Sequence, residues 1–196
     1  FSQRYGIDYD ETFSPVATKS SIRTLIALRV QGWIVRQIDV NTAYLNADVE
    51  EKLYVAQPPG FEQVGDKGEQ LVCRLNKAIY GLKQAGLQWY NHLSKLLLKL
   101  NFKKSVYDPC VFINGDDNIL LATYVDDITI AAKDMNDALK FENALSKYLK
   151  VKTLGDINYI LGWKVDVKPT YVKISQEAYA NRILEQFKMT ECHPVK

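Results

Sequence analysis

The sequence has few of the residues on which secreted and zinc-binding proteins depend. Its three cysteines, Cys73, Cys110 and Cys192, are odd in number and far apart, which argues against a disulfide framework and fits a reducing compartment. Cys192 is followed by His193, but no second pair of potential ligands is near, so we expect no zinc site. The fold must therefore be held by its hydrophobic core.

Long apolar runs are also missing. No stretch approaches the roughly 18–20 apolar residues that a membrane-spanning helix needs. The first five residues do not resemble a signal peptide, so we expect a cytoplasmic protein without a membrane partner. The chain has no initiator methionine, and we interpret it as a fragment of a longer protein.

An excess of charge is absent as well. The 25 Lys and Arg residues against 23 Asp and Glu give a formal net charge of +2, which neither favours nor excludes a nucleic-acid partner. Lysines gather in residues 95–104 and 140–152, but solvated helix faces explain both groups equally well. Apolar residues, in contrast, make up 47% of the 196 positions, which predicts a packed core in one domain or two incomplete lobes.

Apolar periodicity predicts helices that cover one face of an antiparallel sheet, an α+β fold. Ser20 is expected to cap a first helix that ends at Gly32, and a strand should follow over residues 33–40. A longer helix is expected over residues 87–100. The buried stripe of the first helix is expected to be Ile22, Leu25, Ile26 and Val30.

The second half of the chain reads as hairpins separated by helices. Apolar runs over 119–125 and 128–132 predict a hairpin with two aspartates at its tip, and Asp134 should cap the next helix. Residues 159–163 and 171–174 predict short strands, and Ser175 should cap the last helix.

Two Asp-Asp pairs differ in their surroundings. Asp116 and Asp117 lie between a glycine and an asparagine, where Asp is a common turn residue, so this pair needs no function. Asp126 and Asp127 lie between apolar runs, where burial and mutual repulsion require compensation that a Mg²⁺ ion can supply. From the hairpin alone, a solvent-exposed turn explains the second pair equally well.

A third carboxylate, Asp39, follows the apolar strand over residues 33–38. On its own it could end a strand or cap a helix. Together with Asp126 it could form a two-metal site, in which cations about 3.5–4 Å apart assist phosphoryl transfer. The sequence does not show whether the two strands are neighbours.

Six short segments resemble the conserved boxes of reverse transcriptases. Residues 124–127, Tyr-Val-Asp-Asp, resemble the Y-x-D-D box, and residues 39–44 resemble the first catalytic box, an aspartate with an aromatic residue five positions later. Four segments resemble more specifically the copia-type LTR retrotransposon group, and the boxes follow the family's order over essentially the whole chain. These four are residues 8–15, 57–61, 80–85 and 154–157.

The resemblance implies a right-hand polymerase fold, truncated at both ends. The implied parts are partial fingers over 1–36, palm over 37–57, fingers over 58–86, palm over 87–158, a primer-grip hairpin over 159–174 and the start of the thumb over 175–196.

It also implies RNA-directed DNA polymerase activity with two Mg²⁺ ions, or Mn²⁺ in their place. Asp39, Asp126 and Asp127 match the family's catalytic aspartates. Asp39 and Asp126 would ligate the metals directly, and the Val40 carbonyl would be an extra ligand. Asp127 would either ligate a metal or orient the other groups of the site. Contacts to the nucleotide and template are implied at Tyr44, Tyr80, Gly81, Lys83, Tyr124 and Val125.

Several of these residues have plainer explanations. Tyr44 matches a steric gate against the 2′-hydroxyl of ribonucleotides, but it could be a core aromatic. Gly81 would allow a close backbone approach to the substrate, but it could be an ordinary turn glycine. A late-palm lysine, Lys150 or Lys152, could protonate the leaving pyrophosphate.

The implied partners are an RNA or DNA template with its primer, deoxynucleoside triphosphates, and the thumb, RNase H and integrase parts of the polyprotein, in a virus-like particle. Gly86 and Leu87 depart from the family's usual proline and basic residue. A nucleic-acid-binding remnant without turnover is one alternative. A nucleotide cyclase is another, although it gives no reason for the boxes at residues 57–61 and 80–85.

Overall fold

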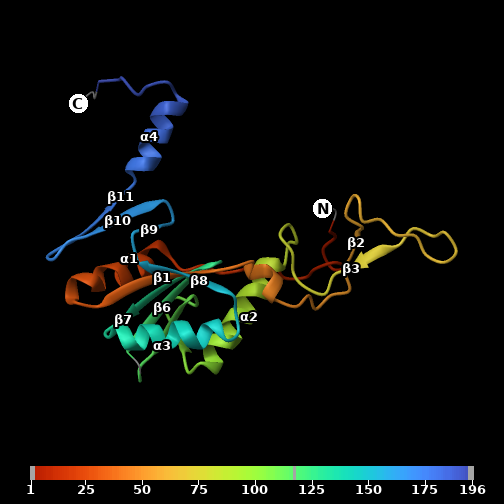
Figure 1. The fold of residues 1–196 in the computed structure, drawn as a ribbon, viewed down its shortest axis with the longest axis horizontal. Helices are drawn as coiled ribbons and strands as arrows, with labels where there is room; N and C mark the ends of the chain where they lie inside the picture. Colours follow the sequence, from red (N-terminus) through yellow and green to blue (C-terminus); the bar gives the residue numbers. More distant parts are fainter. Residues whose placement is uncertain (1–2, 117, 194–196) are drawn as a thin grey trace.

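The computed structural model describes residues 3–116 and 118–193, and its body is a six-stranded sheet of order β4-β5-β6-β7-β1-β8 (Figure 1). Every neighbouring pair in this sheet is antiparallel. The strands are β1 (Ile34–Val40), β4 (Lys103–Lys104), β5 (Val111–Asn114), β6 (Ile119–Tyr124), β7 (Asp127–Ala132) and β8 (Val151–Asp156).

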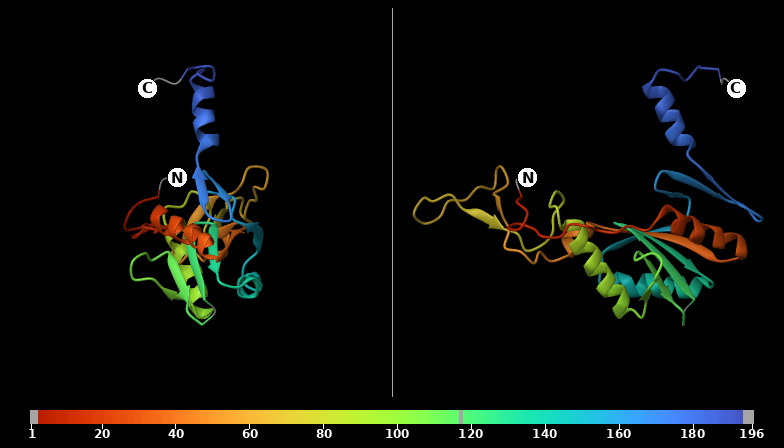
Figure 2. Two further views of the ribbon diagram at one scale, coloured as in Figure 1. Left: turned by 90° about the vertical axis from the view of Figure 1, so that its left-hand side faces the viewer. Right: turned by 180° about the vertical axis from the view of Figure 1, so that it is seen from behind.

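Helices cover both faces of this sheet, as the rear view in Figure 2 shows. Ile38 of β1 faces α2 (Ala85–Lys99) and α3 (Met135–Ser146), whereas Val35 faces α1 (Lys19–Ala27), because successive side chains of a strand point to opposite faces. The α+β class is confirmed. The expectation that helices cover one face only was wrong, because both faces of the central strands are apolar.

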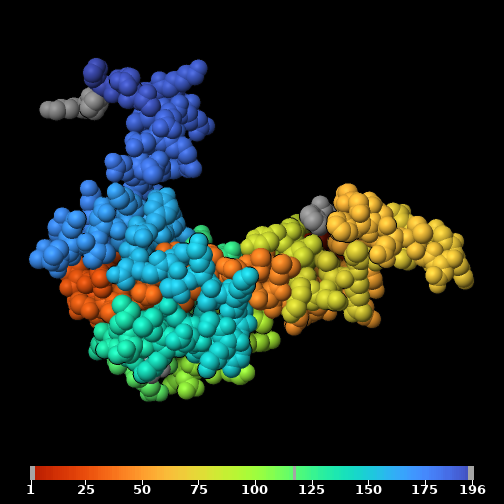
Figure 3. All heavy atoms as spheres, in the orientation of Figure 1, coloured from red at the N-terminus to blue at the C-terminus, as the bar shows by residue number. Residues whose placement is uncertain are grey.

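Two parts project from this body (Figure 3). At one end, β2 (Tyr54–Ala56) and β3 (Val72–Arg74) form a two-stranded arm. At the other, β9 (Tyr159–Ile160), β10 (Trp163–Val167) and β11 (Val172–Ser175) form a separate sheet. It leads into α4 (Glu177–Gln186), which contains no buried residue.

The first helix begins two residues earlier than predicted. Thr18, not Ser20, is its N-cap, and the Thr18 hydroxyl accepts a hydrogen bond from the Ser21 amide at 3.1 Å. After α1 the chain tightens into the 3₁₀ turn η1 (Leu28–Gln31), so Val30 is 46% exposed rather than part of the buried stripe. The other three predicted core positions are buried, and Gly32 ends the segment with a φ of 84°.

The C-terminal hairpin is displaced from its prediction. A turn at Leu161 and Gly162 separates β9 from β10, so residues 159–163 are not one strand. The predicted turn near Pro169 is confirmed between β10 and β11. Ser175 ends β11 and does not cap α4, whose N-cap position is Gln176. The turn after β5 contains Asp116, while Asp117 lies outside the described residues.

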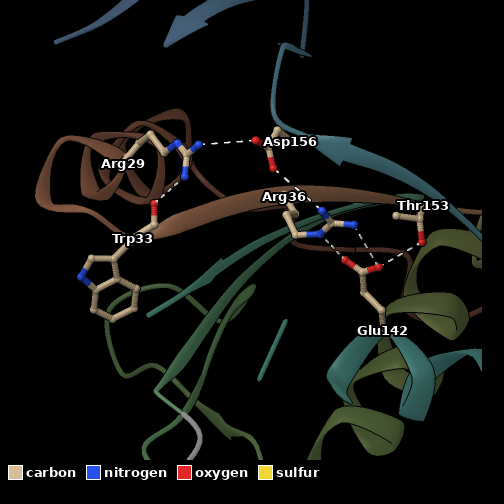
Figure 4. Close-up of polar contacts among 6 residues, drawn as sticks. All are labelled: Arg29, Trp33, Arg36, Glu142, Thr153 and Asp156. Carbon is tan, nitrogen blue, oxygen red and sulfur yellow. Dashed lines mark hydrogen bonds and ion pairs between the residues drawn. The ribbon is translucent and has the colours of Figure 1, made fainter. Parts of the chain in front are cut away.

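A buried ion pair ties the sheet to α3 (Figure 4). The Arg36 guanidinium lies 2.6 Å from Oε1 and 3.3 Å from Oε2 of Glu142, and the two side chains are 13% and 8% exposed. Thr153 of β8 donates to the same carboxylate, and Asp156 bridges Arg36 to Arg29 in η1. The network holds β1 in place between its neighbours.

All three cysteines are unpaired, with Cys110 fully buried and Cys192 exposed. Within residues 3–116 and 118–193, no helix is long and apolar enough to cross a membrane.

Candidate active site

The strands that carry the three candidate aspartates are neighbours. β1 pairs with β7 in a register that places Asp39 directly opposite Asp127, and the Val40 amide donates to the Asp126 carbonyl at 2.8 Å. Residues opposite each other on antiparallel strands have Cα atoms about 4.5–5.5 Å apart and side chains on one face. β1 and β7 are thus neighbours, which the sequence alone does not show. If Asp39 and Asp126 share a metal pair, we expect their carboxylates to lie roughly 4–7 Å apart.

The turn of the β6–β7 hairpin is held in an unusual conformation. Val125 has a φ of 52°, a left-handed value that is costly for a β-branched residue. Its carbonyl accepts a hydrogen bond of 2.8 Å from the indole of Trp89, which is 2% exposed. Helix α2 thereby fixes the turn, and Asp126 lies in it, whereas Asp127 is already the first residue of β7.

Asp126 has one carboxylate oxygen engaged and one without a partner. Its Oδ2 accepts a hydrogen bond from the Tyr80 hydroxyl at 3.0 Å, while its buried Oδ1 has no hydrogen-bond partner. Burial raises the pKa of Asp126, the Tyr80 hydrogen bond opposes this, and the charge of Asp39 adds to the increase. A buried oxygen without a donor is an unmet electrostatic demand, and a cation would satisfy it.

Asp127 is held by a residue that the sequence analysis missed. The amide of Gln37, which is 5% exposed, donates to Asp127 Oδ1 at 2.9 Å. Burial raises the pKa of Asp127, and the charges of Asp39 and Asp126 raise it further, while Gln37 lowers it. Gln37 stands two residues before Asp39 on the same strand, hence on the same face, and this spacing was the available signal.

The expected nucleotide-contacting tyrosines lie together beside Asp126. Tyr44, in the 3₁₀ turn η2 (Ala43–Asn46), and Tyr80 have ring centroids 4.4 Å apart. The pKa of Tyr80 is raised to about 12, mainly by burial and also by the hydrogen bond to Asp126. The pKa of Tyr44 is raised by burial and by the charge of Asp126. Both phenols therefore keep their protons at neutral pH. Tyr44 is only partly buried, packed against the core rather than inside it.

The remaining predicted contacts surround this cluster. Gly81 has a φ of 103°, a conformation that favours glycine. Lys83 is exposed, and its ammonium lies 5.6 Å from the centroid of the Tyr9 ring. Tyr124, at the end of β6, is paired with Asp127 in the hairpin.

The two candidate lysines lie on or next to β8, a strand that was not predicted. Lys152 is directly opposite Asp39 in the β1–β8 register. The backbone carbonyl of Lys150 accepts a hydrogen bond from the Asn41 amide. Opposite residues on antiparallel strands project from the same face, so Lys152 is the better placed of the two to approach the aspartates.

Within residues 3–116 and 118–193, no group of three or more His, Cys, Asp or Glu side chains is arranged to bind a metal ion. Asp126 is hydrogen-bonded to Tyr80, and Asp127 is hydrogen-bonded to Gln37. A cavity of about 220 Å³ lies beside the cluster and is lined by Tyr44, Trp89 and Val125 among others.

Comparison with known proteins identifies the class. The profile of the family described as reverse transcriptase (RNA-dependent DNA polymerase) matches residues 1–196, and the chain belongs to this family. The expected resemblance to copia-type retrotransposons is confirmed by its relatives.

Those relatives are polyproteins. The chain is 43% identical over its whole length to the retrovirus-related Pol polyprotein from transposon TNT 1-94 of Nicotiana tabacum, covering 15% of that protein. It is 39% identical to the corresponding polyprotein from transposon RE2 of Arabidopsis thaliana, covering 14% of it. A solved structure of apo telomerase from Candida tropicalis aligns with 83% of this chain and 41% of that chain, at 13% identity and a TM-score of 0.45, too low to support a fold assignment.

Proposed function

We propose that the chain forms the catalytic centre of an RNA-directed DNA polymerase of a copia-type retrotransposon. In this reaction a primer 3′-hydroxyl attacks the α-phosphate of a deoxynucleoside triphosphate and pyrophosphate leaves. The observation that carries the proposal is the pairing of Asp39 with Asp127, beside an Asp126 whose buried oxygen lacks a partner. The family match over the whole chain supports it.

The regions expected from the family are compatible with this architecture. The sheet that bears the aspartates, with α2 and α3 beneath it, is assigned to the palm, residues 37–57 and 87–158. Residues 1–36 and 58–86, the latter forming much of the projecting arm, are assigned to the fingers. Residues 159–174 are assigned to the primer grip, and residues 175–196 begin the thumb.

The donor set fits divalent cations. Asp39 and Asp126 would ligate two Mg²⁺ or Mn²⁺ ions, with the carbonyl of Val40 as an additional oxygen ligand. When bound, such ions stabilise the attacking and leaving oxygens of an in-line transfer. Metal ligation requires an ionised carboxylate. Because the pKa of Asp126 is raised, a proton competes with the metal for this side chain. Tyr80 already hydrogen-bonds Oδ2 and leaves Oδ1 free to ligate.

The neighbouring side chains would orient the reactants. Gln37 fixes one oxygen of Asp127, so Asp127 acts mainly by orienting and by charge. Tyr44, whose ring is tilted by 43° against that of Tyr80, would lie under the incoming sugar and exclude a 2′-hydroxyl. Lys152, opposite Asp39, would donate a proton to pyrophosphate.

The partners and location follow from the family. A template with its primer and deoxynucleoside triphosphates would be the substrates, and the remaining polyprotein parts would be found with them in a cytoplasmic virus-like particle. A nucleotide cyclase has no support, because the family match includes every box. The alternative of an inactive remnant is decided by the following measurement.

Asp126→Asn should abolish Mg²⁺-dependent deoxynucleotide incorporation by the full-length protein, because the metal loses an anionic ligand. Asp116→Asn is the matched control, since Asp116 lies in the turn after β5 and should be replaceable with little loss. Equal effects of the two substitutions would show that the site is misassigned. Absence of incorporation by the unmodified protein would favour the inactive remnant.

A further inference from the structure

The loop between β4 and β5, residues 105–109, presents two apolar side chains almost entirely to solvent. Val106 is 91% exposed and Tyr107 is 94% exposed. Single exposed hydrophobic residues are common, but an adjacent pair at such exposure contributes little to the core. A binding role would explain the pair if the loop is held in one conformation.

Asp108 fixes the loop to the body. Its carboxylate is 5% exposed and accepts hydrogen bonds from the Thr18 amide at 2.9 Å, the Ser21 hydroxyl at 2.6 Å and the Cys110 amide at 2.9 Å. Burial opposes ionisation of Asp108, but these hydrogen bonds outweigh it and lower its pKa. Asp108 is thus bound, as an anion, to the N-terminal turn of α1.

The other side of the loop is held equally well. The Ser105 amide donates to the Val111 carbonyl at 2.8 Å, and the Tyr107 amide donates to the Ser105 hydroxyl at 3.2 Å. A side chain on a constrained loop loses little conformational entropy when a partner binds it. Tyr107 is therefore a pre-organised contact rather than a mobile one.

The loop lies at the same end of the sheet as the aspartates. The Thr123 amide, just before the Tyr124–Asp127 turn, donates to the Cys110 carbonyl at 2.9 Å. One strand, β6, separates β5 from β7, so the start of β5, to which the loop leads, is roughly 10 Å from β7 across the sheet. Its anchor, α1, covers the face on which Asp39 and Asp127 project.

The surroundings of the tip are basic. Lys103 precedes the loop, and Lys19 begins the helix to which the loop is attached; both are exposed. Lys104 projects to the other face of the sheet and donates to the Tyr90 hydroxyl at 2.9 Å. Asp108 is the single acidic residue between positions 103 and 111, and its carboxylate is already engaged. An exposed aromatic ring among cations is the combination that holds nucleic acids, through stacking and phosphate pairing.

We propose that loop 105–109 contacts the template–primer duplex next to the catalytic centre. Tyr107 packs against a sugar or an unpaired base, while Lys103 pairs with a phosphate. This proposal rests on the proposed polymerase function and extends its binding surface to the β4–β5 side of the sheet.

The test uses the full-length protein and a template–primer with 5-iodouridine placed in turn at each position near the primer terminus, in either strand. Irradiation should crosslink Tyr107 to one or more positions. Tyr107→Ser should raise the Kd for template–primer by about 5-fold or more, the effect expected for one stacked aromatic. It should leave the slope of log Kd against log salt unchanged, whereas Lys103→Gln should reduce that slope by about 1.

Tyr148→Ser is the matched control, because Tyr148 is an exposed tyrosine that follows α3, on the other face of the sheet, and Kd should not change. No crosslink and an unchanged Kd for Tyr107→Ser would overturn the proposal. Loss of self-association in Tyr107→Ser, with Kd unchanged, would overturn it in favour of a protein interface. In either case the proposed function stands as long as Asp126→Asn still abolishes incorporation.

Discussion

At the residue scale, the site is dominated by carboxylates that repel one another. Burial raises the pKa values of Asp126 and Asp127, and Asp39 raises both further. Two hydrogen bonds oppose this, one from Tyr80 and one from Gln37. Asp126 and Asp127 consequently bind protons more tightly than a free aspartate does, and protons compete with a cation for these carboxylates.

Gln37→Leu should show how much the Gln37 hydrogen bond lowers the pKa of Asp127. Without the amide, the pKa of Asp127 rises, so activity should require a higher pH and more Mg²⁺, with turnover at neutral pH falling about 10-fold. The measurements are pH–rate profiles and Mg²⁺ titrations of the full-length protein. Gln31→Leu, at an exposed position, is the control. A lower melting temperature with an unshifted pH profile would mean that Gln37 is merely structural.

Substitutions of Tyr44 should distinguish a role in sugar selection from a role in core packing. If its ring lies under the sugar, Tyr44→Val should raise ribonucleotide incorporation relative to deoxynucleotide, while Tyr44→Phe keeps the ratio. If the ring is chiefly a packing residue, Tyr44→Val should instead cost a few kcal/mol of stability and lower both activities alike. The ratio of incorporation efficiencies distinguishes the two, and an unchanged ratio in Tyr44→Val removes Tyr44 from the site.

The sequence predicted the aspartates but not their support. Asp126 and Asp127 stand out because apolar runs flank them, a local signal. Gln37 is one polar residue in an apolar strand, and its partner lies 90 positions away. Its spacing from Asp39 indicates that the two side chains share a face, but its hydrogen bond to Asp127 depends on the pairing of β1 with β7, which local periodicity does not contain.

At the element scale, β1 is the strand on which the site depends, and the Arg36–Glu142 pair secures it. Glu142→Ala should destabilise the fold by about 3–5 kcal/mol, because Arg36 is left charged and largely buried. The double variant Arg36→Met, Glu142→Leu should recover most of this loss. Urea unfolding measures both.

The control for this prediction is the exposed pair of Lys77 and Asp48. Lys77→Ala should change stability little, because solvent screens that pair. If Glu142→Ala were equally mild, water would have to reach Arg36, and the network in Figure 4 would not be what holds β1.

Elements with strong local signals were predicted and others were not. α2 and the β6–β7 hairpin have clear apolar periodicity, and the Asp134 side chain caps α3 as expected by accepting from the Asn136 amide. β8 was missed because Val151–Asp156 is mostly polar and exposed, and it becomes a strand through its pairing with β1. β2 and β3 are three residues each, too short for a pattern.

At the scale of the whole molecule, the central sheet is well packed, whereas the parts that project from it bury few residues. The six-stranded sheet is covered on both faces, but the arm and α4 project from the body (Figure 3). Helix α4 buries none of its residues, and Phe187 just after it is 65% exposed. The chain spans about 15% of the length of the TNT 1-94 polyprotein and 14% of that from RE2.

This arrangement predicts weak synthesis by residues 1–196 alone. A polymerase holds its duplex largely through phosphate contacts, and each contact that is lost lowers affinity and flattens the salt dependence of binding. Adding the polyprotein segments expected on either side, which include the rest of the thumb, should restore robust extension and steepen the slope of log Kd against log salt. Primer-extension length and template–primer Kd should be compared for both forms, with Asp126→Asn as the inactive control in each. Processive extension by residues 1–196 alone, abolished by Asp126→Asn, would show instead that the sheet, loop 105–109 and the arm together suffice to grip the duplex.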